Sequence, residues 1–102
     1  MRSYLLTEQA QADIEEILDY IAERMANPDG AEVVLDYLHT AMQEVADDPK
    51  KGHARRDLTD RPVMFYRKSK EHKYYILYDP VARPVIILRV AGIRRDFVSL
   101  LQ

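Results

Sequence analysis

The chain has 102 residues, a formal net charge of −2 and no cysteine, and 47% of its residues are hydrophobic. This length fits a single domain, residues 1–102, with one core. The lack of cysteine excludes a disulfide framework and a thiolate metal site. No apolar run is long enough for a secretory signal or a membrane span, so we expect a soluble cytoplasmic protein with no membrane contact.

The small net charge conceals a division along the chain. Residues 1–48 contain two basic and twelve acidic residues, a balance of −10, whereas residues 49–102 contain thirteen basic and five acidic residues, a balance of +8. Two interpretations are open: the halves form different surfaces, one of them suited to an anionic partner, or they neutralise each other across the fold.

The first half of the sequence predicts a short strand followed by a helix. Residues 2–6 alternate enough for a strand, and Thr7 can cap a helix with Glu8 in its first turn. Apolar residues then recur at helical spacing, and acidic residues cover most of the remaining circumference, which predicts a solvated face. The apolar positions are Ile14, Ile17, Leu18, Ile21 and Met25, and the acidic ones are Asp13, Glu15, Glu16, Asp19 and Glu23.

A second helix is predicted directly after the first. Asn27 can cap it, and Pro28 suits its first position because the missing N–H is not needed there. Its apolar stripe ends before Pro49, and the short connection requires an antiparallel hairpin. The stripe consists of Ala31, Val34, Leu35, Leu38, Met42 and Val45.

The second half predicts a long connection and three strands. Residues 49–62 have no periodicity, and Leu58 is their one plausible anchor to the core. Strands are expected at 63–68, 74–79 and 85–91; the first is amphipathic and near an edge, and the other two are apolar enough to be covered on both faces. The order β-α-α-β-β-β predicts an α+β sandwich, in which a helix hairpin packs on a small, mainly antiparallel sheet.

No motif for a cofactor, a metal or a catalytic group is found. His39, His53 and His72 have no spacing that gathers them on one face, and the three glycines form no phosphate-binding cluster. Glu15 and Asp19 lie on one helix face, but an outward face offers no pocket that would shift their pKa values. We therefore expect no cofactor, no metal and no catalytic residue.

Arg89 stands in the middle of the most apolar strand, "VIILRVA". Strict alternation would place it on one face with Val85, Ile87 and Ala91, where an unpaired guanidinium is costly. We expect either a carboxylate partner in the free fold or an acidic ligand in a complex.

Several stretches together resemble the ParE branch of the ParE/RelE superfamily, the small toxins of bacterial type II toxin–antitoxin pairs. They are "LTEQAQADIEEILDYIAE", the "NP" break, "ADDPKKGHARRDLTDRPV", "YYILYDPVARPVIILRV" and the terminal "RRDF". The resemblance covers nearly the whole chain and implies the same β-α-α-β-β-β fold. It also implies a toxin that inhibits growth or stabilises a plasmid, with a cognate antitoxin that wraps a disordered, acidic segment around it.

The two branches of the superfamily imply different activities. ParE-like members resemble inhibitors of DNA gyrase that leave cleaved DNA trapped on it, whereas RelE-like members cut messenger RNA on the ribosome and need a proton-transfer group near the last strand. Here Arg89 is followed by no such group, and Gly92 stands where many ParE relatives carry a histidine. This favours a gyrase-directed toxin that binds without catalysis and without sequence-specific contact to nucleic acid. A nuclease that uses Tyr66 or His72 instead, and a non-toxic binding module, are the alternatives.

The candidate site lies at the end of the chain. We expect target binding by Arg89, Arg94, Arg95, Asp96 and Phe97, and a secondary basic surface of Arg55, Arg56, Arg67, Lys68 and Lys70. A short C-terminal helical turn could lay Phe97, Leu100 and Leu101 against the domain or against the target. Asp96 could pair with Arg94 or Arg95, or hold Arg89.

Overall fold

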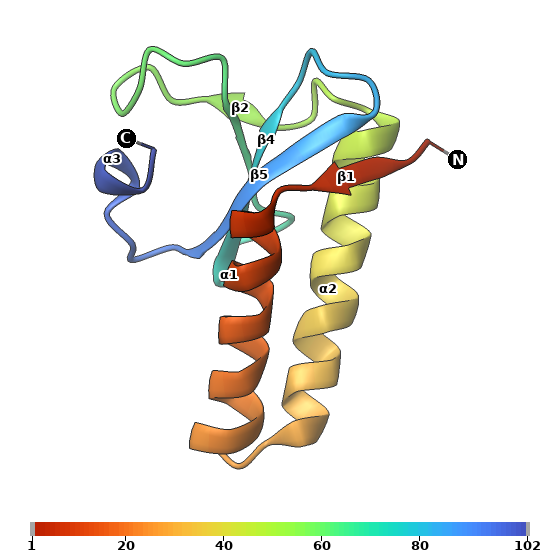
Figure 1. The fold of residues 1–102 in the computed structure, drawn as a ribbon, viewed down its shortest axis with the longest axis vertical. Helices are drawn as coiled ribbons and strands as arrows, with labels where there is room; N and C mark the ends of the chain where they lie inside the picture. Colours follow the sequence, from red (N-terminus) through yellow and green to blue (C-terminus); the bar gives the residue numbers. More distant parts are fainter. Residues whose placement is uncertain (1, 102) are drawn as a thin grey trace.

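The computed structural model describes residues 2–101. Its helices α1 and α2 run side by side as a hairpin, joined through the π-helix η1, and the strands form one sheet across one end of that hairpin (Figure 1). In chain order the elements are β1 (Tyr4–Leu6), α1 (Glu8–Asp19), η1 (Tyr20–Arg24), α2 (Pro28–Asp47), β2 (His53–Ala54), β3 (Met64–Tyr66), β4 (Tyr74–Asp79), β5 (Val85–Gly92) and α3 (Phe97–Leu100).

The helices begin at the capping residues that the sequence predicts. The Thr7 hydroxyl accepts a hydrogen bond from the Ala10 N–H at 3.0 Å, and the Asn27 side chain accepts one from the Gly30 N–H at 2.9 Å. The first helix changes at Tyr20 into the π-helix and does not continue as one α-helix. Met25 therefore lies beyond the helix and is 57% exposed, so its predicted place in the apolar stripe is wrong.

The sheet has the strand order β1-β5-β4-β3-β2. β1 is parallel to β5, and the other neighbours are antiparallel, which confirms the predicted α+β class and the mainly antiparallel sheet. As expected, β3 lies near an edge of the sheet, although it is not the outermost strand. The long connection contains β2, which pairs with β3 through His53–Phe65 and Ala54–Met64. A strand of two residues is too short to show an alternating pattern in the sequence.

Both faces of the sheet are covered. On the face toward the helices, Leu38 and Met42 of α2 pack with Ile76 and Tyr78 of β4. On the opposite face Leu77 belongs to a second, smaller cluster, which α3 and the long connection cover. The members of that cluster are Val63, Phe65, Leu77 and Leu101, with Leu58, Tyr75, Leu88, Phe97 and Leu100 packed against them. The expected two-sided burial of β4 and β5 and the anchoring role of Leu58 are therefore confirmed.

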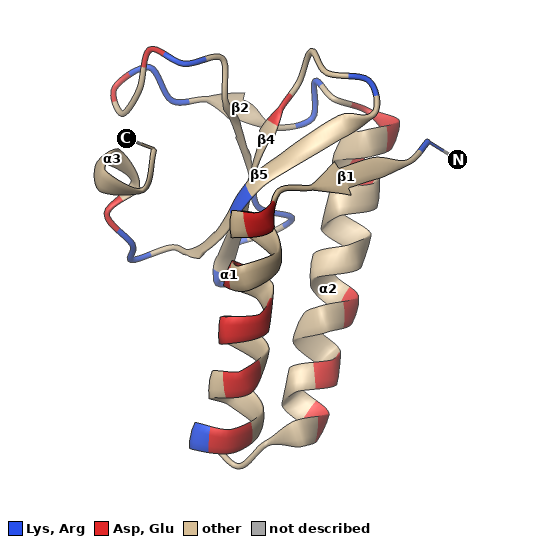
Figure 2. Cartoon of the chain, in the orientation of Figure 1, with Lys and Arg blue, Asp and Glu red and all other residues tan. Residues whose placement is uncertain are grey.

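The two charge classes occupy different parts of the molecule. Figure 2 shows that most acidic residues lie along α1 and α2, whereas basic residues lie mainly in the connections around the sheet. The charge asymmetry of the sequence thus corresponds to two surfaces. Within the described residues, no helix combines the length and the apolar character that a membrane span requires.

Candidate functional site

The register of β5 on β4 contains an irregularity beside Arg89. Tyr78 pairs with Ile87 but Leu77 pairs with Arg89, so Leu88 is an extra residue in β5. Because paired residues share a face, Arg89 lies on the face of Leu77 and not on that of Ile87. The expectation that strict alternation places Arg89 with Val85 and Ile87 is wrong, since the extra residue shifts the alternation by one.

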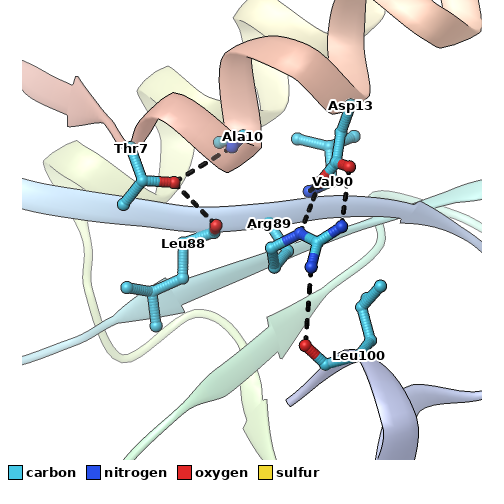
Figure 3. Close-up of polar contacts among 7 residues, drawn as sticks. All are labelled: Thr7, Ala10, Asp13, Leu88, Arg89, Val90 and Leu100. Atoms are coloured by element: carbon cyan, nitrogen blue, oxygen red, sulfur yellow. Dashed lines mark hydrogen bonds and ion pairs between the residues drawn. The ribbon is translucent and has the colours of Figure 1, made fainter. Parts of the chain in front are cut away.

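Arg89 has a carboxylate partner within the fold. Its Nε donates to Asp13 Oδ2 at 2.8 Å and its Nη2 donates to Asp13 Oδ1 at 2.9 Å, a bidentate pair (Figure 3). These hydrogen bonds raise the pKa of Arg89. Asp13 is only 8% exposed, so its expected place on the solvated face of α1 is wrong. Of the two options for Arg89, the structure shows the carboxylate of the free fold.

Beyond the residues that pair with β1, the backbone of β5 is bonded by the side chains of Thr7, the N-cap of α1, and Asp13, in the middle of α1. The Thr7 hydroxyl donates to the Leu88 carbonyl at 2.8 Å, and Asp13 Oδ2 accepts from the Val90 N–H at 3.0 Å (Figure 3). The Thr7 N–H also donates to the Ile87 carbonyl at 3.1 Å. Asp13 therefore fixes both the side chain of Arg89 and the strand on which Arg89 lies.

The C-terminal segment packs against the domain. The Phe97 ring meets Phe65 and Tyr75 edge-on, with centroids 5.5 and 5.7 Å apart. Leu101 is 6% exposed, and its carbonyl accepts a hydrogen bond from Arg61 Nη1 at 2.9 Å. Of the two places considered for this segment, the described residues adopt the one against the domain.

Asp96 has a partner that the sequence did not suggest. Its carboxylate accepts hydrogen bonds from the Ser99 hydroxyl and the Ser99 N–H, at 2.8 and 3.3 Å, and so caps α3. These bonds lower the pKa of Asp96, the hydroxyl contributing most. Asp96 is the N-cap of α3 and forms no ion pair with Arg89, Arg94 or Arg95 among the described residues.

Arg94 and Arg95 are both exposed, in the turn between β5 and α3. Neither forms an ion pair within residues 2–101. Arg95 borders a hollow of about 190 Å³ together with Asp13, Glu16 and Tyr74. Among the five predicted target-binding residues, Arg94 and Arg95 thus have free charged groups, whereas Arg89 and Phe97 are engaged within the fold.

The predicted secondary basic surface is divided among several environments. Arg55 pairs with Asp57 at 2.8 Å and Lys68 pairs with Glu44 at 3.0 Å. Arg67 lies over the Tyr75 ring, 5.3 Å from its centroid. Lys70 and Arg56 are exposed and form no ion pair with the described residues. Among these ten positions, the cations without an ion pair therefore include Arg94 and Arg95 at the C-terminal turn and Arg67 and Lys70 at the end of β3 and in the turn after it.

The two groups considered as substitute proton carriers are held by neighbours. The Tyr66 hydroxyl donates to Glu44 Oε2 at 2.5 Å, and burial together with this bond raises the pKa of Tyr66. His72 stacks on Tyr37 with centroids 3.8 Å apart, and its Nδ1 lies 2.8 Å from Ser69 Oγ. No set of three His, Asp or Glu side chains within residues 2–101 could hold a metal ion.

Glu44 and Asp13 are the two residues of this region that sequence reasoning missed. Glu44 accepts hydrogen bonds from Tyr66 and Lys68; burial alone would raise its pKa, but these bonds outweigh burial and lower it. Of the two, only Asp13 could have been identified from the sequence. It directly precedes Ile14 of the apolar stripe, and Arg89 required a carboxylate partner.

The family of the chain follows from comparison with known proteins. Residues 4–97 match the family model described as "ParE toxin of type II toxin-antitoxin system, parDE". The chain belongs to this family of toxins. Among solved structures, it is similar to one described as "Chromosomal ParDE TA system from P. aeruginosa", with a TM-score of 0.71 and 18% sequence identity over 92% of this chain and 98% of that one. No curated protein sequence matches significantly.

Proposed function

We propose that this ParE-family toxin inhibits DNA gyrase by binding it while DNA is cleaved, and that it has no hydrolytic site of its own. The observation that supports the absence of a hydrolytic site is the hydrogen bonding of the carboxylate beside Arg89. The carboxylate nearest to this arginine, Asp13, accepts three hydrogen bonds within the fold and is buried. A carboxylate whose oxygens are engaged in this way is not free to contact a substrate.

The binding group of the proposal is the turn with Arg94 and Arg95. Both guanidinium groups are exposed and lack ion-pair partners within residues 2–101, so they can pair with carboxylates or phosphates of a target. α3 behind them is fixed by Phe97 and Leu101, which gives the turn a rigid support. Since gyrase acts on the chromosome, the proposal implies action in the cytoplasm.

The proposal includes neutralisation by a cognate antitoxin with an acidic, disordered segment. The family match and the similarity to a structure of the P. aeruginosa ParDE system support such a partner. The balance of +8 in residues 49–102 would attract an acidic segment. Association should then be fast at low ionic strength and should slow as salt is added.

The test compares DNA damage with message cleavage. After induction of the toxin, we expect relaxed plasmid and double-strand breaks with intact messages; cut messages with intact DNA would show a nuclease, and neither effect would show a non-toxic module. In a purified assay, gyrase and supercoiled plasmid should yield linear DNA only when the toxin is present.

Charge reversal locates the binding group. Arg94→Glu/Arg95→Glu should abolish linear DNA but leave the fold and antitoxin capture intact, because exposed substitutions usually change stability by no more than about 0.5 kcal/mol. Arg2→Glu/Arg24→Glu, which reverses two exposed cations of the acidic half, is the matched control and should remain active. Full activity of the Arg94/Arg95 variant would contradict the proposal.

A further inference from the structure

A second group of free cations surrounds a hollow that the proposed function does not use. This basic hollow, of about 250 Å³, lies at the β2–β3 end of the sheet. Residues from the turn after α2, from β2 and β3, from the β3–β4 turn and from β4 border it. Those with polar groups are Lys51, His53, Tyr66, Arg67, Ser69, Lys70 and Tyr75; Phe65 is the remaining one, and none is acidic.

Arg67 is held at the basic hollow by contacts that leave its charge unpaired. Its guanidinium carbon lies 5.3 Å from the centroid of the Tyr75 ring, and its Nη1 donates a long, 3.4 Å hydrogen bond to the His72 carbonyl. Tyr75 is itself fixed by the edge-on contacts with Phe65 and Phe97. The other N–H groups of Arg67 remain able to donate to an anion, because a guanidinium has five donors.

The cations around the basic hollow outnumber the carboxylates that pair with them. Glu44, outside the hollow, is the one described carboxylate that pairs with them; it lies 3.0 Å from Lys68 and 3.8 Å from Lys51. Arg67 and Lys70 form no ion pair within residues 2–101. Like charges that converge in a concave site repel one another, and concave walls focus their field on an incoming anion.

The positions and types of the side chains that line the basic hollow indicate which class of anionic ligand it binds. The cations that line the hollow come from separate segments, Lys51 from the turn after α2 and Arg67 and Lys70 from the end of β3 and the turn after it. A ligand with several anionic groups in series can contact more of them than one free phosphate. Asn and Gln, which read base edges, are absent from the lining. We propose that the basic hollow binds the phosphodiester backbone of a polynucleotide without reading its sequence.

Binding is tested with the full chain and without gyrase, so the result is independent of the proposed gyrase inhibition. Fluorescence anisotropy compares single-stranded DNA, RNA of the same sequence, duplex DNA and a poly-glutamate peptide over a series of salt concentrations. We expect binding of polynucleotides that weakens with salt and is unchanged when the sequence is scrambled. Tighter binding of RNA or of DNA would support the proposal equally and identify the natural source of the backbone.

Two double variants locate the contact. Arg67→Gln/Lys70→Gln should weaken binding at low salt by about tenfold or more and reduce the slope of log K against log salt by about 1.4, since each lost phosphate contact on a single strand contributes about 0.7. Arg2→Gln/Arg24→Gln removes the same formal charge from the acidic half and should leave the slope unchanged. Thermal melting confirms that both variants are folded.

Three outcomes would overturn the proposal: no polynucleotide binding by the wild-type chain, equal weakening by the two double variants, or poly-glutamate that binds as tightly as the polynucleotides and displaces them. The last would show that the basic hollow receives an acidic protein segment. In an amide NMR spectrum with single-stranded DNA, shifts should concentrate at residues 51–54 and 66–70; shifts confined to other parts of the chain would also contradict it.

Discussion

The two faces of the sheet are covered by different means. One face is covered by α1 and α2, of 12 and 20 residues, whose apolar stripes bury Leu38 and Met42 completely. The other is covered by α3, of four residues, and by the connection that carries Leu58. The small cover depends on individual contacts, namely the Phe97 ring and the arginines that reach the carbonyls of Leu100 and Leu101.

Arg89 connects the two covers. It pairs with Asp13 of α1, and its Nη1 makes a long, 3.5 Å contact with the Leu100 carbonyl of α3 (Figure 3). The comparison teaches that the helical face is stabilised by area and the other face by a few directed contacts. Substitutions in these contacts should therefore show how much each cover contributes to the stability of the fold.

Loss of Asp13 should have the largest effect. Asp13→Ala leaves the guanidinium of Arg89 largely buried and unpaired and removes the acceptor of the Val90 N–H, so we expect about 3–5 kcal/mol less stability in urea denaturation. The double variant Asp13→Ala/Arg89→Met should recover part of this loss, because replacing both partners of a buried pair can be close to neutral. A loss below about 1 kcal/mol for Asp13→Ala would show that the pair does not connect the covers.

Phe97→Ala should affect the α3 face alone. The ring is partly buried, so we expect a loss of about 2 kcal/mol, below the range for a fully buried aromatic residue. Hydrogen exchange should accelerate at the amides of Leu100 and Leu101, which donate to Asp96 and Phe97. The control Val98→Ala, at a residue that is 45% exposed, should change little. Faster exchange throughout α2 would contradict the separation of the faces.

Stability should fall at both ends of the pH scale through contacts around Glu44. The pKa of Glu44 is lowered, so its contribution is complete above the usual value of about 4.3 and is lost as pH falls through its folded value. The pKa of Tyr66 is raised, so its contribution is complete below about 10 and is lost as pH rises further. Denaturant unfolding across pH measures both losses.

The variant Glu44→Gln assigns the acidic loss to this residue. It should cost about 1 kcal/mol near neutral pH and flatten the acidic side of the curve, since glutamine does not titrate and accepts weaker hydrogen bonds. Glu32→Gln, at an exposed residue of the same helix, is the control. An acidic side that is equally steep in both variants would assign the loss to other carboxylates.

The smallest expected effect is an increase in stability from a substitution in the turn of the helical hairpin. Ala26 connects η1 to α2 with φ 50°, in the left-handed region that glycine adopts without steric cost. Ala26→Gly should therefore raise stability by up to about 1 kcal/mol, and Ala22→Gly within η1 should lower it by a similar amount. Thermal melting measures both, and a lower melting temperature for Ala26→Gly would contradict the prediction.

Local rules predicted the helical face well and the other face in part. The caps at Thr7 and Asn27, the hairpin and the strand at residues 74–79 follow from side-chain chemistry and periodicity. The extra residue in β5 does not, because "VIILRVA" is apolar on both sides of its arginine and carries no mark of the irregularity. The face of Arg89 depends on that residue, and its pairing with Asp13 spans 76 positions that no local pattern relates.

The candidate functional site, like the α3 face of the sheet, was predicted only in part. Clustered charge was enough to indicate the exposed cations Arg94 and Arg95. The role of Asp96 as a cap of α3 was missed, because a helix of four residues has no periodic signal from which its N-cap could be located. The place of Phe97 depended on aromatic partners from two other strands.

The side chains of Thr7 and Asp13 have a consequence for how copies of this chain behave toward one another. Strands with open backbone groups recruit strands from other molecules, the usual first step of aggregation. Beyond the three residues that β1 pairs, the Leu88 carbonyl of β5 is already bonded to Thr7, the N-cap of α1, and the Val90 N–H to Asp13 of α1. These two groups of the longest strand are thereby unavailable to a strand from another molecule, even when no other protein covers this edge.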